Sequence, residues 1–231
     1  MENATENTKE NNSQKPMDSK PIVGAILIVG IMIAGAILLK GGGGVNTSSK
    51  TPISKEDHIL GNPKAEIVIV EYSDTECPFC KVFHQTMHQV VNKSEGKVAW
   101  VYKHYPIEGL HPKAPLEAEA TECAWEQGGN TVFWEYIDEV FLRTESNNKL
   151  DLAELPKIAE SLGLDVGKFN SCVDSGKYKE KVQSHISDGN LAGVRGTPSS
   201  FILKNGSVVG TIPGAQSFEG VMAQLETLLI D

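Results

Sequence analysis

Positive charge is scarce in this sequence. Lysine and arginine together number 21, against 30 aspartate and glutamate residues, which gives a formal net charge of −9 at pH 7. The first fifty residues are nearly neutral, with five lysines and four acids, so almost all of the negative charge lies in the remainder. An acidic chain of this kind repels phosphate backbones, and the composition therefore argues against a nucleic-acid partner.

The sequence has no internal repeat, and only one long apolar run. Its 231 residues, 40% of them hydrophobic, allow one domain of ordinary size plus extensions. Residues 21–39 carry no charge, and as a helix they would extend roughly 29 Å, the thickness of a bilayer core. We expect a retained transmembrane anchor. A cleavable signal peptide is the alternative, although the preceding polar stretch is long for one.

The predicted anchor divides the chain into four parts. Residues 1–20 are polar and are predicted to form a disordered cytoplasmic tail. Residues 40–55 include four consecutive glycines at 41–44 and are predicted to be a flexible linker. Residues 56–231 are the predicted folded domain. Lysines flank both ends of the run at 21–39, so the distribution of positive charge does not determine the orientation of the anchor. The extracytoplasmic position of the domain is predicted from its cysteine chemistry instead.

Cysteine is also scarce, with four residues in the whole chain. Two of them, Cys77 and Cys80, follow an apolar β-branched run at 66–72 and precede a helical pattern. At a strand-to-helix junction Cys77 would lie at the helix N-terminus, where free backbone N–H groups and the helix dipole favour the thiolate. Cys80 would follow one turn later on the same face, close enough to form a disulfide with Cys77. The pair predicts a reactive dithiol.

Periodicity predicts the order of the remaining elements. Residues 97–103 have the alternation of a second strand, so the dithiol helix lies within a βαβ unit. Residues 199–203 and 208–212 predict a hairpin, and 218–229 a final helix. Between these parts, about 112–192 is helical, with predicted helices at 115–126, 132–142, 151–162, 166–175 and 178–192. The order predicts an α/β fold with one helical insertion.

These features resemble the DsbA-like thiol:disulfide oxidoreductases, in which a helical domain interrupts a thioredoxin fold. The resemblance covers residues 57–229. It rests on the segment 71–80 around the dithiol, on Phe-Trp-Glu-Tyr at 133–136, on Gly-Val-Arg-Gly-Thr-Pro at 193–198, and on the strand-turn-strand that follows. The resemblance implies an enzyme that exchanges disulfides and needs no cofactor.

The resemblance also implies roles for four residues around the dithiol. Pro198 would follow a cis peptide bond and face Cys77, so that the backbone of Thr197 could pair with an extended substrate. Pro78 and Phe79 would complete an apolar groove for unfolded chains. An ordinary trans proline at a strand start is the alternative for Pro198.

Glu71 lies six residues before Cys77, at the offset where this superfamily carries a partly buried acid beneath the second cysteine. Such an acid could accept or relay the proton of Cys80. Lys103, on the neighbouring predicted strand, is the expected ion-pair partner of Glu71. The alternative is a purely structural pair of acid and lysine.

Phe79 departs from the family pattern, because strongly oxidising DsbA proteins have a histidine directly before the second cysteine. The departure removes a group that stabilises the Cys77 thiolate, and Asp74 and Glu76 add negative charge that opposes it. Since an oxidant is strong when its reduced form is stable, we expect a milder oxidant.

Cys123 and Cys172 both lie within the predicted helical insertion. We predict a structural disulfide between them in an oxidising compartment. Closing a loop of about fifty residues would stabilise the fold by roughly 4 kcal/mol. Two buried free cysteines that pack as small hydrophobic side chains are the alternative.

The expected partners are unfolded or partly folded exported proteins with free cysteines, and a membrane reoxidant of the DsbB or VKOR type. We expect a monomer, because no dimerisation segment is visible between the linker and the fold. Two alternatives are a disulfide reductase or isomerase fed by a membrane electron donor, and a membrane-tethered holdase that uses the apolar surface of the helical domain.

A metal-binding module is a further alternative. Cys77, Cys80, His84 and His88 fall on one face of the predicted helix, and thiolates with imidazoles suit zinc or copper(I). However, His88 would lie about 16 Å along the helix from Cys77, too far to share one ion. No metal is predicted on this basis, and both histidines are interpreted as ordinary helix residues.

Overall fold

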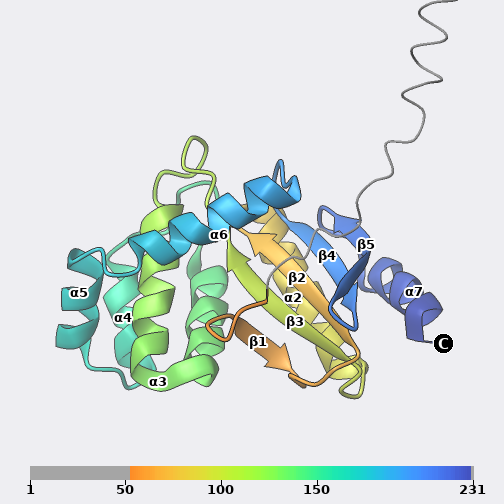
Figure 1. Cartoon of the computed structure of the whole chain (residues 1–231). Helices are drawn as coiled ribbons and strands as arrows, with labels where there is room; N and C mark the ends of the chain where they lie inside the picture. The colour runs from red at the N-terminus through yellow and green to blue at the C-terminus, as the bar shows by residue number, and fades with distance from the viewer. Residues whose placement is uncertain (1–52, 230–231) are drawn as a thin grey trace, which may run out of the picture. The chain divides into compact units, whose positions relative to one another are not determined.

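Runs of buried β-branched and aromatic residues form the central sheet of this computed structural model, which describes residues 53–229 (Figure 1). The strands lie in the order β1-β3-β2-β4-β5. β2 and β3 are parallel, and the other neighbours are antiparallel. The bounds are His58–Gly61 for β1, Ile67–Ser73 for β2, Val98–His104 for β3, Ser199–Lys204 for β4 and Ser207–Pro213 for β5.

β1 is a strand that the sequence did not predict. It has only four residues, too few to show an alternating pattern, and its first residue is the polar His58. The strand exists because it pairs with β3, where His58 lies opposite Tyr102. Tertiary pairing rather than local propensity therefore determines this edge of the sheet.

Helices α2 (Pro78–Lys93) and α7 (Phe218–Leu229) share one core with the sheet. The helices contribute buried apolar side chains at regular intervals, and β2, β3 and β4 contribute side chains from one face. Members of this core include Phe83, Met87, Val90, Val221 and Leu225 from the helices and Ile67, Ile69, Trp100 and Ile202 from the strands. Cys80 belongs to the same core, so its packing fixes the first turn of α2.

Four helices interrupt the chain between β3 and β4 (Figure 1). They are α3 (Ala114–Arg143), α4 (Glu154–Ser161), α5 (Val166–Asp174) and α6 (Lys179–Ala192). α3 is broken at Gly129, whose φ of 69° lies in the left-handed region that favours glycine. The two helices predicted at 115–126 and 132–142 are therefore the two halves of α3. The predicted order βαβ, helical insertion, ββα is confirmed.

The helical insertion has a core of its own, which includes Tyr136, Ile158 and Phe169. Cys123 of α3 and Cys172 of α5 are joined by a disulfide, with their Cα atoms 5.9 Å apart. This confirms the predicted pairing. The bond closes a loop with a sequence separation of 49, which corresponds to roughly 4 kcal/mol on the chain-entropy estimate.

Glu122 of α3 is completely buried where the helical insertion meets the sheet. Its carboxylate lies 2.9 Å from His58 Nε2, 3.1 Å from His104 Nε2 and 2.7 Å from Lys181 Nζ. Burial by itself raises the pKa of Glu122, but the hydrogen bonds from His104 and His58 outweigh it and hold the pKa well below its usual range. An ionised acid thus links α3 to β1, β3 and α6.

The predicted tail at 1–20 and the predicted anchor at 21–39 lie outside the described residues. The same holds for positions 40–52 of the predicted linker. Within residues 53–229, no helix is both long enough and apolar enough to cross a membrane. The anchor and the linker stay predictions.

Candidate active site

The junction between β2 and α2 presents the dithiol. Cys77 is the N-cap residue of α2, with extended backbone angles, and Pro78 occupies the first helical turn, where no amide hydrogen is needed. Cys80 has no exposed surface, whereas 5% of Cys77 is exposed. Both thiols are therefore buried, and only the leading one reaches the surface.

The two thiols differ in acidity. A hydrogen bond from the Cys80 thiol is the largest cause that lowers the pKa of Cys77, to about 6, and the backbone N–H groups of Cys80 and Phe79 also contribute. Burial, followed by the neighbouring Cys77, raises the pKa of Cys80 well above its usual range. At neutral pH Cys77 is thus mainly a thiolate and Cys80 a thiol, which is the asymmetry that disulfide exchange requires.

The loop that follows α6 faces the dithiol. The Thr197–Pro198 peptide bond is cis, as predicted. The Cys77 sulfur lies 3.5 Å from the backbone carbonyl oxygen of Thr197, to which it donates a hydrogen bond when it is protonated. Pro198 is buried and Thr197 half-buried, so the loop leaves backbone groups of Thr197 available beside the reactive sulfur.

Glu71 of β2 is completely buried, and among the described residues no well-aligned hydrogen bond reaches either carboxylate oxygen, although the donors of Ser73 and Trp100 lie nearby. Burial is the largest cause that raises the pKa of Glu71, to about 8, while Ser73 and Trp100 offset part of the rise. The charge of Glu71 also contributes to the high pKa of Cys80. A protonated Glu71 near neutral pH fits a proton relay to Cys80.

The predicted ion pair between Glu71 and Lys103 is wrong. Glu71 lies opposite Tyr102 in the parallel pairing of β2 and β3, and Lys103 lies opposite Tyr72. Because successive side chains of a strand point to opposite faces, Lys103 projects to the face away from Glu71. Its ammonium group lies 2.6 Å from Asp57 Oδ1 instead.

Asp74 and Glu76, predicted to oppose the Cys77 thiolate, bind other donors. Asp74 accepts hydrogen bonds from the Ile107 backbone at 2.7 Å and from His111 Nδ1 at 2.9 Å. The Glu76 carboxylate accepts from Thr144 Oγ1 at 3.0 Å. Both carboxylates thus form hydrogen bonds with groups other than Cys77, and the pKa of Cys77 remains low.

Sequence reasoning missed Glu117 of α3. Thr75, which lies two residues before Cys77, donates a hydrogen bond from its hydroxyl to the Glu117 carboxylate at 2.6 Å. Burial is the largest cause that raises the pKa of Glu117, to about 8, and the neighbouring Glu76 and Asp74 add to it. No sequence signal could identify this acid, because it stands among several acids on a helix forty-two residues from Thr75.

Phe79 is the most exposed side chain of the dithiol segment, with 65% of its surface accessible. Val82, one turn further along α2, is 60% exposed, and Pro78 is half-buried. Apolar side chains at the start of α2 are therefore accessible next to Cys77 in the chain. The substrate-binding roles of Pro78, Phe79 and Thr197 stay predictions.

The four residues considered for a shared metal site do not converge. Within residues 53–229, His84 and His88 come together with Asp138 of α3 rather than with Cys77 and Cys80. The dithiol is thus free of competing imidazole ligands in the described part of the chain.

Comparisons with known proteins agree with this architecture. The family model described as "Thioredoxin" matches residues 53–226, nearly all of the described fold. The crystal structure of DsbA2 from Pseudomonas aeruginosa is similar, with 26% identity, a TM-score of 0.64, and coverage of 77% of this chain and 97% of that one. That of α-DsbA1 from Wolbachia pipientis has 25% identity, a TM-score of 0.65, and coverage of 77% and 92%.

Oxidised BdbD from Bacillus subtilis has a TM-score of 0.68 with 19% identity, covering 78% of this chain and 96% of that one, and shows the fold alone. Among curated proteins, the Na(+)/H(+) antiporter NhaA 3 of Salinispora tropica is 32% identical over 146 residues. The match covers 63% of this chain and 21% of the antiporter. The chain thus spans about a fifth of that relative, and the antiporter name describes a much longer protein.

Proposed function

Because this chain belongs to the thioredoxin family, we propose that it is a thiol:disulfide oxidoreductase that introduces disulfides into exported proteins through the Cys77–Cys80 pair. The observation that carries the proposal is the unequal acidity of the two thiols. The pKa of Cys77 is lowered to about 6 and that of Cys80 is raised by burial. The titles of the similar structures, DsbA2 and α-DsbA1, support the same class of chemistry.

The exchange begins on the closed form of the pair. A substrate thiolate attacks the Cys77 sulfur, the bond between the two cysteines breaks, and the Cys80 sulfur leaves with the electron pair. Because burial disfavours a Cys80 thiolate, this sulfur takes up a proton, which a protonated Glu71 can donate. The second substrate thiolate then attacks the substrate sulfur of the mixed disulfide, and Cys77 leaves as a thiolate. The substrate loses two electrons and the dithiol gains them.

The Cys77 pKa of about 6 supports a mild oxidant. The corresponding cysteine has a pKa of about 7 in thioredoxin and about 3.5 in the strongly oxidising DsbA. A more stable leaving thiolate favours the reduced enzyme and hence oxidation of the substrate. This chain, with Phe79 in place of histidine, falls between the two.

Turnover needs an acceptor for the two electrons, and a membrane reoxidant of the DsbB or VKOR type is the proposed partner. The proposed location is the extracytoplasmic side of the cell membrane, with residues 21–39 as a single-pass anchor and a monomeric domain. The exposed Phe79 and Val82 support binding of unfolded chains with little side-chain preference.

A trapping experiment tests the direction of flow. In Cys80→Ala, the mixed disulfide on Cys77 cannot be resolved internally, so partners purified from the native membrane stay attached. Trapped cysteines from exported proteins are the expected result. Trapped cysteines from a membrane electron donor would assign a reductase or isomerase instead, and the absence of adducts beyond those of Cys77→Ala/Cys80→Ala would contradict exchange altogether.

A further inference from the structure

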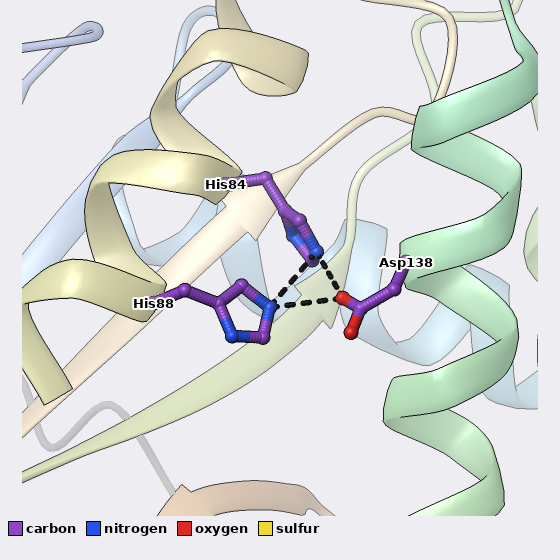
Figure 2. Close-up of side chains that lie close together, drawn as sticks. All are labelled: His84, His88 and Asp138. Carbon is purple, nitrogen blue, oxygen red and sulfur yellow. Dashed lines mark hydrogen bonds and ion pairs between the residues drawn. The ribbon is translucent and has the colours of Figure 1, made fainter. Parts of the chain in front are cut away.

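Two histidines and one aspartate bring their side chains close together (Figure 2), with one potential ligand atom of each within 4.8 Å of the others. His84 and His88 lie one turn apart on α2, and Asp138 faces them from the second half of α3. His84 Nε2 lies 2.6 Å and His88 Nε2 lies 2.9 Å from Asp138 Oδ1, and the two nitrogens are 3.2 Å apart.

Hydrogen bonds alone leave one of the three contacts in this arrangement without a proton. Three close contacts join three atoms, and a carboxylate such as that of Asp138 only accepts. Each Nε2 carries at most one proton. If both point at the carboxylate, the contact between the nitrogens of His84 and His88 has no shared proton. If His88 donates to His84 instead, the contact of His84 with Asp138 has none.

A cation at the centre satisfies all three atoms at once. We propose that His84, His88 and Asp138 bind a divalent transition-metal ion such as zinc, with water as the fourth ligand. Imidazole nitrogen and carboxylate oxygen are usual zinc ligands, and three protein ligands plus water form an open site. Two imidazoles disfavour calcium and magnesium, which prefer oxygen ligands.

The geometry requires little change. Donor atoms that lie about 2.0–2.1 Å from a tetrahedral zinc ion are roughly 3.3 Å from one another. The three observed separations, from 2.6 to 3.2 Å, would thus widen by about 0.1 to 0.7 Å. The spacing of His84 and His88, four residues apart on a helix, places both on the same face, as in helical zinc-binding motifs.

Aromatic side chains lie around His84. Its ring centroid lies 4.5 Å from that of Phe141 and 5.1 Å from that of Trp100. Its Nε2 atom, which faces Asp138, is the nitrogen available to an ion, while Nδ1 is buried without a partner among the described residues.

An ion can reach the site from solvent. The side chains of His88 and Asp138 are 28% and 44% exposed and line a cavity of about 380 Å³ between α2 and α3. Lys81 also lines it, but its ammonium group contacts the carbonyls of Leu142 and Thr144. Among the described residues, the partners of Asp138 are the two histidines, so no lysine or arginine neutralises its charge.

The bound ion would join α2, which carries the dithiol, to α3 of the helical insertion. Metal binding would therefore stabilise the contact between the two parts of the fold. This inference does not depend on the direction of disulfide exchange.

Zinc titration of the full chain tests the site. Cys77→Ser/Cys80→Ser is the background, so that the dithiol cannot bind the ion, and calorimetry at pH 7 with zinc chloride gives stoichiometry and affinity. We expect one ion per molecule. His88→Gln and Asp138→Asn should each weaken binding by more than about tenfold, since both remove a direct ligand.

Glu135→Gln is the matched control, because Glu135 is an exposed acid on the same helix as Asp138. Its affinity should match the background, and zinc should raise the melting temperature of the background and of this control but not of the two ligand variants. The proposal is overturned if no saturable binding occurs, or if His88→Gln and Asp138→Asn bind zinc as tightly as Glu135→Gln. Circular dichroism without metal verifies that each variant is folded.

Discussion

The Cys77 sulfur lies 3.5 Å from the backbone carbonyl oxygen of Thr197, a residue 120 positions further along the chain. The helical insertion lies between them in sequence, so the fold brings the loop after α6 to the dithiol. In a mixed disulfide on Cys77 no thiol donor would remain, and the proposed role of Thr197 predicts that a backbone N–H of the bound peptide takes its place at this carbonyl.

The low pKa of Cys77 depends first on the Cys80 thiol. Cys80→Ala removes this donor, whereas Cys80→Ser keeps a hydroxyl donor. A hydrogen bond to a charged group is worth about 1.5 kcal/mol, so below pH 6 we expect Cys77 in Cys80→Ala to be alkylated about tenfold more slowly than in Cys80→Ser. Iodoacetamide rates measured against pH supply the comparison. If the alkylation rate of Cys77 had its pH midpoint at about 8.5 in both variants, as for free cysteine, the basis of the redox assignment would be lost.

Local sequence was sufficient to predict the dithiol and its helix. The strand before Cys77, Pro78 in the first turn and Cys80 one turn later follow from residues adjacent in the chain. The Gly129 break in α3 also has a local signal, because two glycines interrupt the helical pattern. These features depend on short-range geometry, which composition and spacing encode.

Contacts between distant segments could not be predicted in the same way. The predicted pair of Lys103 and Glu71 is wrong because the register of β2 and β3, and hence the face of each side chain, is fixed only in the folded sheet. From α3, Glu117 contacts Thr75 beside the dithiol and Asp138 contacts His84. Strand β1 forms only by pairing with β3. Each of these depends on how the helical insertion or the edge strand packs.

Glu71 should make the stability of the oxidised protein depend on pH. Its folded pKa of about 8 lies above the unfolded value of 4.5, so the unfolded state releases the proton first and stability falls as pH rises through this range. Glu71→Gln removes the ionisable group. At pH 8 we expect the variant to be more stable than wild type by a few kcal/mol, and at pH 4 to differ by about 1 kcal/mol or less.

Urea unfolding at both pH values measures the difference. Glu66→Gln is the control, because Glu66 directly precedes the same strand but is exposed. Its stability should follow wild type at both pH values. An equal pH dependence of Glu71→Gln and wild type would show that Glu71 is ionised in the folded state, and would exclude it as a proton donor to Cys80 near neutral pH.

The Cys123–Cys172 disulfide should stabilise the fold without taking part in exchange. The double variant Cys123→Ala/Cys172→Ala is expected to lose roughly 4 kcal/mol of unfolding free energy, because the unfolded chain gains the freedom of the opened loop. Its rate of disulfide transfer to a reduced peptide, measured below the unfolding transition, should stay within about twofold of wild type. A large loss of transfer rate in a folded variant would implicate this disulfide in the redox reaction.

Lys103 should act through Asp57 and not through the dithiol. The pair is buried, with side-chain exposures of 3% and 0%. Lys103→Met leaves Asp57 with the Ser54 backbone N–H and the nearby His185 but without its lysine partner, and should cost about 3 kcal/mol of stability. Lys97→Met, at an exposed position before β3, should be nearly neutral. Because Lys103 projects away from Glu71, resolution of a mixed disulfide by Cys80 should proceed at the wild-type rate in Lys103→Met but slow in Glu71→Gln. If resolution slowed equally in both variants, Lys103 and Glu71 would act together, in conflict with the register of β2 and β3.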